Sequence, residues 1–128
     1  MGESRTIGDF LNSPPQCGYF IKLDITINAI GHEQQGYRYA LVVSRNSLNK
    51  SGKGLAIICP ITNTDTGDAF HLSIPDGCGL TGFLLVDQVR SIDYVGRQAS
   101  YAGKCPEPLF MDVLRCLRVL TFPKDFKI

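Results

Sequence analysis

Two short apolar runs, at residues 39–44 and 54–61, constrain the fold of this chain more than any other feature. Both are rich in β-branched residues, which is typical of strands. Their hydrophobicity is nearly continuous rather than alternating, which indicates strands that are buried on both faces. Residues 45–53 join them as a turn-rich connection. We therefore expect two strands with apolar cover on both faces.

Further strand-like segments lie on both sides of this pair in the chain. Residues 18–25 are the first expected strand, and residues 69–74 alternate as a half-exposed strand would. Residues 82–90 are interpreted as one more strand, which is unusual in ending on Asp-Gln. Residues 1–17 contain two consecutive prolines and little periodicity, so we interpret them as an extended or frayed lead-in to a single domain at residues 18–128.

The last element has a different period. Its apolar residues recur at three- and four-residue steps, as on one face of a helix, and are Phe110, Val113, Leu114, Leu117 and Leu120. Pro108 fits the first turn of this helix and Pro123 ends it. Short strands with one closing helix predict a mainly β (α+β), barrel-like domain.

Length and composition fit a single soluble domain. The chain has 128 residues, of which 44% are hydrophobic, and this is enough for one modest core. We find no apolar run long enough to span a bilayer and no basic-then-apolar order of a signal peptide at the N-terminus. We therefore expect a cytoplasmic protein that does not enter a membrane.

The positions of the charged residues along the sequence say more about possible ligands than the net charge does. A net charge of +1 argues against a general nucleic-acid coat. The segment from His32 to Lys53 contains four basic residues and one acidic residue. The segment from Thr62 to Tyr94 contains five aspartates and a single basic residue, Arg90. A basic segment beside an acidic one permits a local anion-binding face. A solvated loop explains the same charges equally well.

The common sequence-readable enzyme and metal motifs are absent. The five cysteines form no C-x-x-C pair, and Cys59 and Cys116 fall within apolar runs, where a small buried hydrophobe is expected. The two histidines have no metal-ligand spacing, and no G-x-S-x-G or Walker loop occurs. We expect no metal and no cofactor.

Three polar segments remain that could carry chemistry. Residues 32–38 gather a histidine, a carboxylate, two amides and an arginine, which suits phosphoryl transfer because arginine forks onto phosphate oxygens. Residues 60–65 carry a buried strand into a polar turn, and residues 86–93 place Asp-Gln after an apolar run. Ordinary turn chemistry explains each segment as well as a site would.

Taken together and in order, these segments resemble the MazF/PemK toxin family. The chain carries Gly-His-Glu-Gln-Gln-Gly-Tyr-Arg-Tyr at residues 31–39, Pro-Ile-Thr at 60–62, Val-Asp-Gln-Val-Arg-Ser-Ile-Asp at 86–93, and the closing segment at 103–120. The resemblance covers about residues 18–120. One such motif is a weak signal, but four at compatible spacing are a strong one.

The resemblance implies an SH3-like antiparallel β-barrel of the CcdB/MazF type with a C-terminal helix, assembled as a homodimer. It implies a metal-independent endoribonuclease that cuts single-stranded RNA in a groove at the dimer interface. The ribose 2′-OH would attack the adjacent phosphate and leave a 2′,3′-cyclic phosphate, so RNA is required. A MazE-like antitoxin with an acidic, partly disordered segment would block the groove.

The resemblance also implies roles for individual residues. By position, Arg38 matches the catalytic arginine and Thr62 the catalytic threonine. Glu33 is the candidate base, and His32 is a base or a positioning group. The positions that would line the groove and contact bases are Gln34, Gln35, Asn63, Asp87 and Gln88.

The chain departs from the family pattern in a few places, and two other functions remain open. Tyr39 stands where a proline usually follows the catalytic arginine, and the chain has no tryptophan. These departures motivate a non-catalytic binding module that keeps the groove but lacks turnover. A gyrase poison like CcdB would share the fold, but its Trp-Gly-Ile tail is replaced here by the C-terminal sequence Asp-Phe-Lys-Ile.

Overall fold

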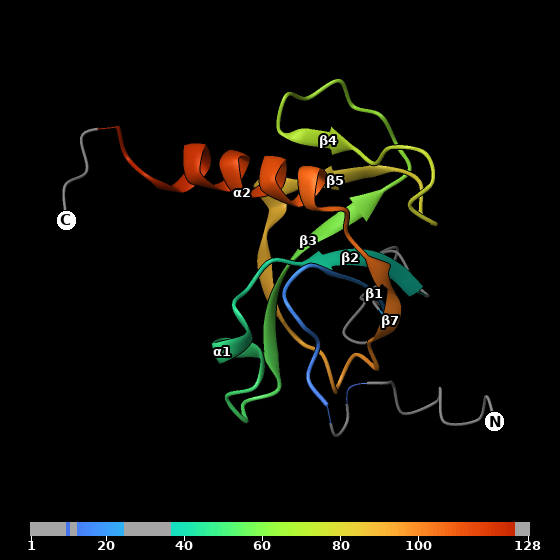
Figure 1. Ribbon diagram of the computed structural model, residues 1–128, viewed down its shortest axis with the longest axis vertical. Coiled ribbons are helices and arrows are strands. Elements are labelled where there is room, and N and C mark those ends of the chain that lie inside the picture. Colours follow the sequence, from blue (N-terminus) through green and yellow to red (C-terminus); the bar gives the residue numbers. More distant parts are fainter. Residues whose placement is uncertain (1–9, 11–12, 25–36, 125–128) are drawn as a thin grey trace, which may run out of the picture.

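The computed structural model describes residue 10, residues 13–24 and residues 37–124. Within these residues most strands are short and one long helix closes the chain (Figure 1). The elements are β1 (Tyr19–Asp24), β2 (Tyr37–Val42), α1 (Asn46–Asn49), β3 (Leu55–Thr62), β4 (His71–Ser73), β5 (Phe83–Leu85), the 3₁₀ turn η2 (Val86–Gln88), β6 (Arg90–Asp93), β7 (Ser100–Lys104) and α2 (Glu107–Thr121).

Strand β3 organises the sheet, in which every pairing is antiparallel. One edge of β3 pairs with β2, and its other edge is shared, since the first half pairs with β6 and the last two residues pair with β5. The order β7-β1-β2-β3-β6 forms a curled barrel, and β5 and β4 extend it on one side. The turn between β6 and β7 closes the barrel against the end of β1. There the Asp24 amide donates to the carbonyl of Arg97, which lies in this turn, at 2.8 Å.

Alternate side chains of the central strands enter two separate cores. Ala40, Ala56 and Ile58 point into the barrel, whereas Leu41 and Cys59 point to the outer face. All five are buried. The continuous apolar runs of β2 and β3 therefore follow from burial on both faces, as the sequence predicted.

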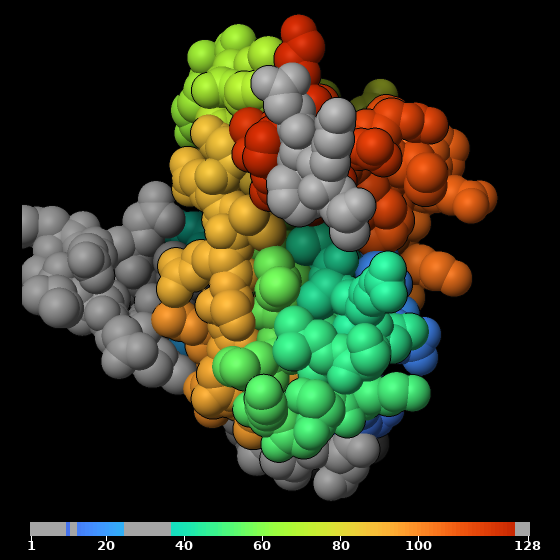
Figure 2. Space-filling model, turned by 90° about the vertical axis from the view of Figure 1, so that its left-hand side faces the viewer, coloured from blue at the N-terminus to red at the C-terminus, as the bar shows by residue number. Residues whose placement is uncertain are grey.

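Helix α2 covers the outer core. Its Leu109 and Val113 are buried against a cluster that includes Leu84 of β5. Figure 1 shows the helix lying across the sheet near β5, and Figure 2 shows α2 and the α1 segment at opposite ends of another face. Within the described part of the chain, no helix is long and apolar enough to cross a membrane.

Hydrogen bonds of a buried asparagine hold the N-terminal segment against the barrel. Asn49 of α1 is buried and its Nδ2 donates to the Pro15 carbonyl at 3.0 Å, while the Tyr94 hydroxyl donates to the Asn49 carbonyl at 2.7 Å. Phe10 belongs to the barrel core and its ring meets that of Tyr94 edge-on. Part of the lead-in thus packs on the domain.

The structure confirms in their central residues the strands expected at 18–25, 54–61 and 69–74. It also confirms the strand expected at 39–44, which begins and ends two residues earlier, as β2, and it corrects the fifth. The prediction of one strand over residues 82–90 is wrong, because η2 interrupts it and sends β5 and β6 to different halves of β3. Strand β7 was not predicted, since its Ser-Tyr-Ala-Gly-Lys sequence lacks a clear alternation. Residues 45–53 contain the single turn α1 rather than turns alone.

The predicted helix is confirmed, with Pro108 in its first turn, but its buried stripe is partly wrong. Leu109 is buried, whereas Leu120, which was assigned to the stripe, is 37% exposed. The helix packs on the outer core from Leu109 to Leu117, so the stripe begins one residue earlier than predicted and ends before Leu120.

Two leucines of α2 therefore provide a matched test of this packing. Leu109→Ala removes buried methyl groups and should lower the free energy of unfolding by about 2–5 kcal/mol. Leu120→Ala removes an equal volume from an exposed position and should change it by less than about 0.5 kcal/mol. Urea titrations of both variants measure the difference. Equal losses would contradict the placement of the helix.

Candidate active site

A hollow of about 630 Å³ opens at the mouth of the barrel. Its floor consists of side chains that belong to the barrel core, namely Leu23, Ala40, Ile58 and Ile92. Its rim is polar and comes from the ends of several strands and from the turns that follow them. Such a concave site with an apolar floor and convergent polar groups is the usual form of a ligand site.

Strands β2 and β3 bring Arg38 and Thr62 to the same place. In the β2–β3 register Ala40 pairs with Pro60, so two residues further along each strand Arg38 stands opposite Thr62. Alternation puts both side chains on the face that carries Ala40, which is the interior face. Both residues line the hollow. The two predicted catalytic residues, 24 positions apart in the chain, thus meet at the barrel mouth.

Each of these side chains is oriented by a hydrogen bond. The Nη1 atom of Arg38 donates to the Tyr37 carbonyl at 3.0 Å. The Thr62 Oγ1 accepts from the Thr64 amide at 3.2 Å, so the hydroxyl serves there as acceptor. Because a hydroxyl both donates and accepts, the Thr62 proton can be directed at an oxygen of a ligand in the hollow.

Within the described part of the chain, three arginines line the hollow. Arg38 comes from β2, Arg90 from β6 and Arg97 from the turn before β7, where its Nη1 donates to the Asp24 carbonyl at 3.4 Å. Among the described residues that line the hollow, none is acidic. A chain with a net charge of only +1 therefore concentrates positive charge at one place, which favours an anionic ligand.

The sequence did not single out Arg90 as a site residue, and it gave no weight to Arg97. Arg90 was counted within the acidic segment, yet it shares the interior face with Ile92 by strand alternation. That alternation is a signal that could have found it. Arg97 reaches the hollow only through the turn that closes the barrel, and nothing in its local sequence indicates this.

The other predicted site residues divide into three groups. Asn63 and Gln88 line the hollow with Arg38 and Thr62. Asp87 is not among the lining residues, since its carboxylate is directed to His71. The remaining predictions, His32, Glu33, Gln34 and Gln35, lie outside the described residues.

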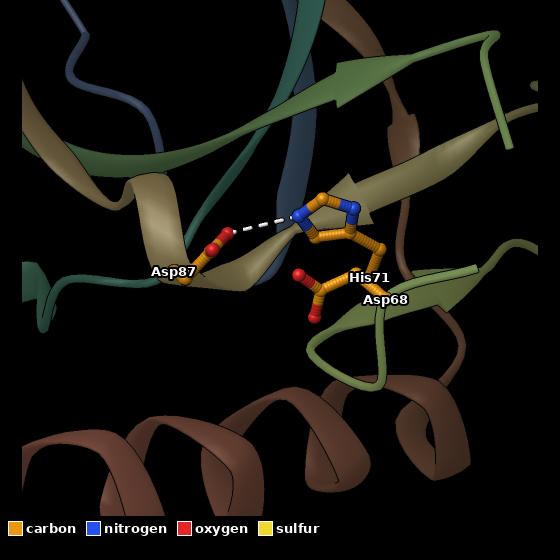
Figure 3. A group of neighbouring side chains, drawn as sticks. All are labelled: Asp68, His71 and Asp87. Atoms are coloured by element: carbon orange, nitrogen blue, oxygen red, sulfur yellow. Dashed lines mark hydrogen bonds and ion pairs between the residues drawn. The ribbon is translucent and has the colours of Figure 1, made fainter. Parts of the chain in front are cut away.

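Figure 3 shows Asp68, His71 and Asp87 pointing toward one another near α2. The His71 Nε2 lies 3.0 Å from the Asp87 Oδ1, and the His71 Nδ1 bonds to the Thr66 hydroxyl. The three residues have the composition of a metal site, with one ligand atom each within 4.8 Å of the others. Both ring nitrogens are already engaged, so the arrangement serves to hold the loop before β4 against η2.

The buried cysteines have the character of core residues rather than nucleophiles. Burial raises the pKa of Cys59 and of Cys105 to about 12. Burial also raises the pKa of Cys116, which the carboxylates of Asp87 and Asp68 raise further. Since the thiolate is the reactive form, these thiols are poor nucleophiles near neutral pH. Cys59 is buried as predicted, and Cys116 packs partly buried against the same core.

Comparison with known proteins assigns this chain to a family. The model of the PemK-like, MazF-like toxin of type II toxin–antitoxin systems matches residues 17–121. The chain belongs to this family. Endoribonuclease PemK of Escherichia coli is 34% identical to it over 109 residues, which are 80% of this chain and 78% of PemK.

Solved structures of MazF share the fold. MazF from Deinococcus radiodurans superimposes with a TM-score of 0.73 at 34% identity, covering 84% of this chain and 96% of MazF. A MazE–MazF structure from the same organism gives a TM-score of 0.73 at 29% identity, with 85% and 96% covered. The predicted MazF-type β fold with a C-terminal helix is thus confirmed.

One glycine of this PemK-like chain, missed in the sequence, determines the position of Thr62. Gly82 precedes β5 and has a φ of +126°. A Cβ atom there would lie 2.5 Å from the Thr62 carbonyl oxygen and 3.2 Å from the Asn63 Oδ1. No real Cβ is accommodated at the shorter distance, so any side chain at residue 82 must displace the end of β3 and with it the rim of the hollow.

Gly82→Ala should therefore impair the site beyond its backbone strain. Gly79 is the matched control, because its φ of +82° imposes a similar strain while a Cβ there would meet nothing within 4 Å. We expect Gly79→Ala to cost about 1–2 kcal/mol of stability and to leave ligand binding in the hollow intact. Gly82→Ala should cost more and weaken that binding. Equal behaviour of the two variants would contradict this role of Gly82.

Proposed function

We propose that this chain is a toxin endoribonuclease that cuts single-stranded RNA without a metal ion. The observation that carries the proposal is the meeting of Arg38 and Thr62 at the rim of an arginine-lined hollow. Family membership and the 34% identity to an endoribonuclease support the same activity. We further propose a cytoplasmic location, which an RNA substrate and membership of the toxin family support.

In this reaction the ribose 2′-oxygen attacks the adjacent phosphorus. A bond forms between that oxygen and phosphorus as the 2′-hydroxyl proton passes to a base. The bond from phosphorus to the 5′-oxygen breaks, and the departing 5′-oxygen takes up a proton in exchange. The products are a 2′,3′-cyclic phosphate and a 5′-hydroxyl. Negative charge grows on the phosphoryl oxygens at the transition state, and preorganised donors aimed at that charge lower the barrier.

Arg38 and Thr62 are suited to this task. The Arg38 guanidinium stabilises the phosphorane charge and the leaving oxygen, and its fork of donors matches phosphate oxygens. The Thr62 hydroxyl donates to a second phosphoryl oxygen, since its proton remains available while the oxygen accepts from the Thr64 amide. The apolar floor of the hollow strengthens both interactions, because charges attract more strongly where water is excluded.

Other residues complete the proposed site. Glu33 is the candidate base, with His32 as a second base or a positioning group. Asn63 and Gln88 line the hollow and are placed to contact bases. We assign the same contact role to Gln34 and Gln35, whereas Asp87 could contact a base only from outside the hollow, because its carboxylate pairs with His71.

The proposed assembly is a homodimer that an antitoxin inhibits. A relative from Deinococcus radiodurans forms a MazE–MazF complex. An acidic antitoxin segment would compete with RNA for Arg38, Arg90 and Arg97, which are the cations of the described residues that line the hollow.

Arg38→Ala should lower kcat about 10²–10³-fold while changing KM much less, because the interaction is strongest in the transition state. Arg115→Ala is the control, since Arg115 lies exposed on α2 and pairs with Asp112 within the helix. Single-turnover cleavage of a long, weakly structured RNA measures both variants. An active Arg38→Ala variant would contradict the assignment.

Thr62 allows a second test that separates the hydroxyl from the shape of the side chain. Thr62→Val keeps the branched shape and removes the hydroxyl, so it should slow cleavage at least about tenfold. Thr62→Ser keeps the hydroxyl and should retain most of the activity. If both variants cleave equally, the hydroxyl has no part in the reaction.

A further inference from the structure

Two exposed tyrosines stand at the rim of the hollow. Tyr37 is 43% exposed and Tyr39 is 36% exposed. Both belong to β2 and both line the hollow. They are two residues apart, so their side chains leave the same face of the strand about 6–7 Å from each other. Arg38 lies between them and points to the interior face. Along this strand a phosphate-binding cation thus alternates with two aromatic rings.

A lysine from the neighbouring strand holds the two rings. Lys22 of β1 pairs with Tyr39, and its ammonium lies 5.3 Å from the Tyr37 ring centroid and 5.9 Å from the Tyr39 ring centroid. These are cation–π distances. The Tyr37 hydroxyl also donates to the Gln98 Oε1 at 3.4 Å. The rings are therefore oriented before any ligand arrives, which lowers the entropy lost on binding.

The mixture of rings and cations identifies the chemistry of the ligand. An acidic peptide would match the cations Lys22 and Arg38 but would leave the exposed ring faces unused. A single-stranded nucleic acid offers both a phosphate for each cation and a flat base for each ring. Stacking of bases on aromatic side chains beside a positive groove is the usual way in which such strands are held.

We propose that Tyr37, Tyr39 and Lys22 form a base-stacking subsite beside the catalytic hollow. A base adjacent to the cleaved phosphate stacks on a tyrosine ring while Lys22 contacts a phosphate of the same strand. This inference rests on the proposed ribonuclease function. Tyr39 stands where the family pattern has a proline, so the subsite is a feature of this chain rather than of the pattern.

The subsite determines how tightly the nucleic-acid strand binds and in which register, but it does not select among bases. Every base has a π-face, so stacking on Tyr37 or Tyr39 tolerates any sequence. Discrimination among bases requires hydrogen bonds to their edges, which fall to polar groups such as Asn63 and Gln88 in the hollow. Arg38 thus binds a phosphate, the two tyrosines stack on the faces of bases, and the side-chain amides of Asn63 and Gln88 contact the edges of bases.

The test compares a short single-stranded DNA with an abasic strand of the same length. DNA lacks the 2′-OH, so it is bound and not cut. The chain has no tryptophan, so its emission comes from its five tyrosines, and stacking on Tyr37 and Tyr39 should quench part of it. The parent should bind the base-bearing strand about tenfold more tightly, or better, with quenched emission. A Tyr37→Ala/Tyr39→Ala variant should lose that preference while keeping its affinity for the abasic strand to within about threefold.

Two further variants exclude a loss of folding as the cause. Tyr37→Phe/Tyr39→Phe keeps the rings and should keep the preference. Tyr101→Ala removes a tyrosine that is 51% exposed on β7 and does not line the hollow, so it should also keep the preference.

Equal binding of the two strands by the parent, or an undiminished preference in the double alanine variant, would overturn the subsite. Cleavage of RNA by the parent is measured separately. A parent that prefers bases but leaves RNA intact would refute the proposed function and leave the subsite standing.

Discussion

The shared edge of β3 is the constraint on which the rest of this structure depends. Its first half pairs with β6 and its last two residues pair with β5, while β2 occupies its other edge. Its side chains enter the barrel core and the outer core in turn. A strand with two buried faces and two paired edges has little freedom to move. A residue at the end of β3 therefore has a well-defined position.

Thr62 is the residue at that end, and the other residues of the site are arranged around it. The β2–β3 register brings Arg38 opposite it, and Gly82 allows β5 to approach its backbone so closely that no side chain fits between them. The same interior face supplies the apolar floor and, through β6, Arg90. A rigid scaffold that places charge over an apolar floor is what transition-state stabilisation requires. The geometry of the proposed catalytic site and the packing of the core therefore have the same origin.

Local pattern predicted much of this fold, and its failures have physical reasons. The double-sided burial of β2 and β3 is visible in their continuous apolar runs, and Arg38 and Thr62 were recognised from motif order. The break at η2 was not predicted, because Val86 is as apolar as the strand it interrupts, and only its long-range partners show that the chain changes direction there. Arg97 and Gly82 were missed for a related reason. Their roles exist only once a turn or a neighbouring strand is folded against them, and residue spacing does not record that.

The ends of the RNA fragments, formed in EDTA, test the central claim most directly. The account predicts discrete cuts in a single-stranded RNA, each leaving a 2′,3′-cyclic phosphate and a 5′-hydroxyl, with no cut at a position whose 2′-OH is replaced by hydrogen. That result would identify the 2′-oxygen as the nucleophile and exclude a required metal. Fragments bearing 3′-hydroxyl and 5′-phosphate ends, or cleavage that appears only when a divalent ion is added, would contradict it.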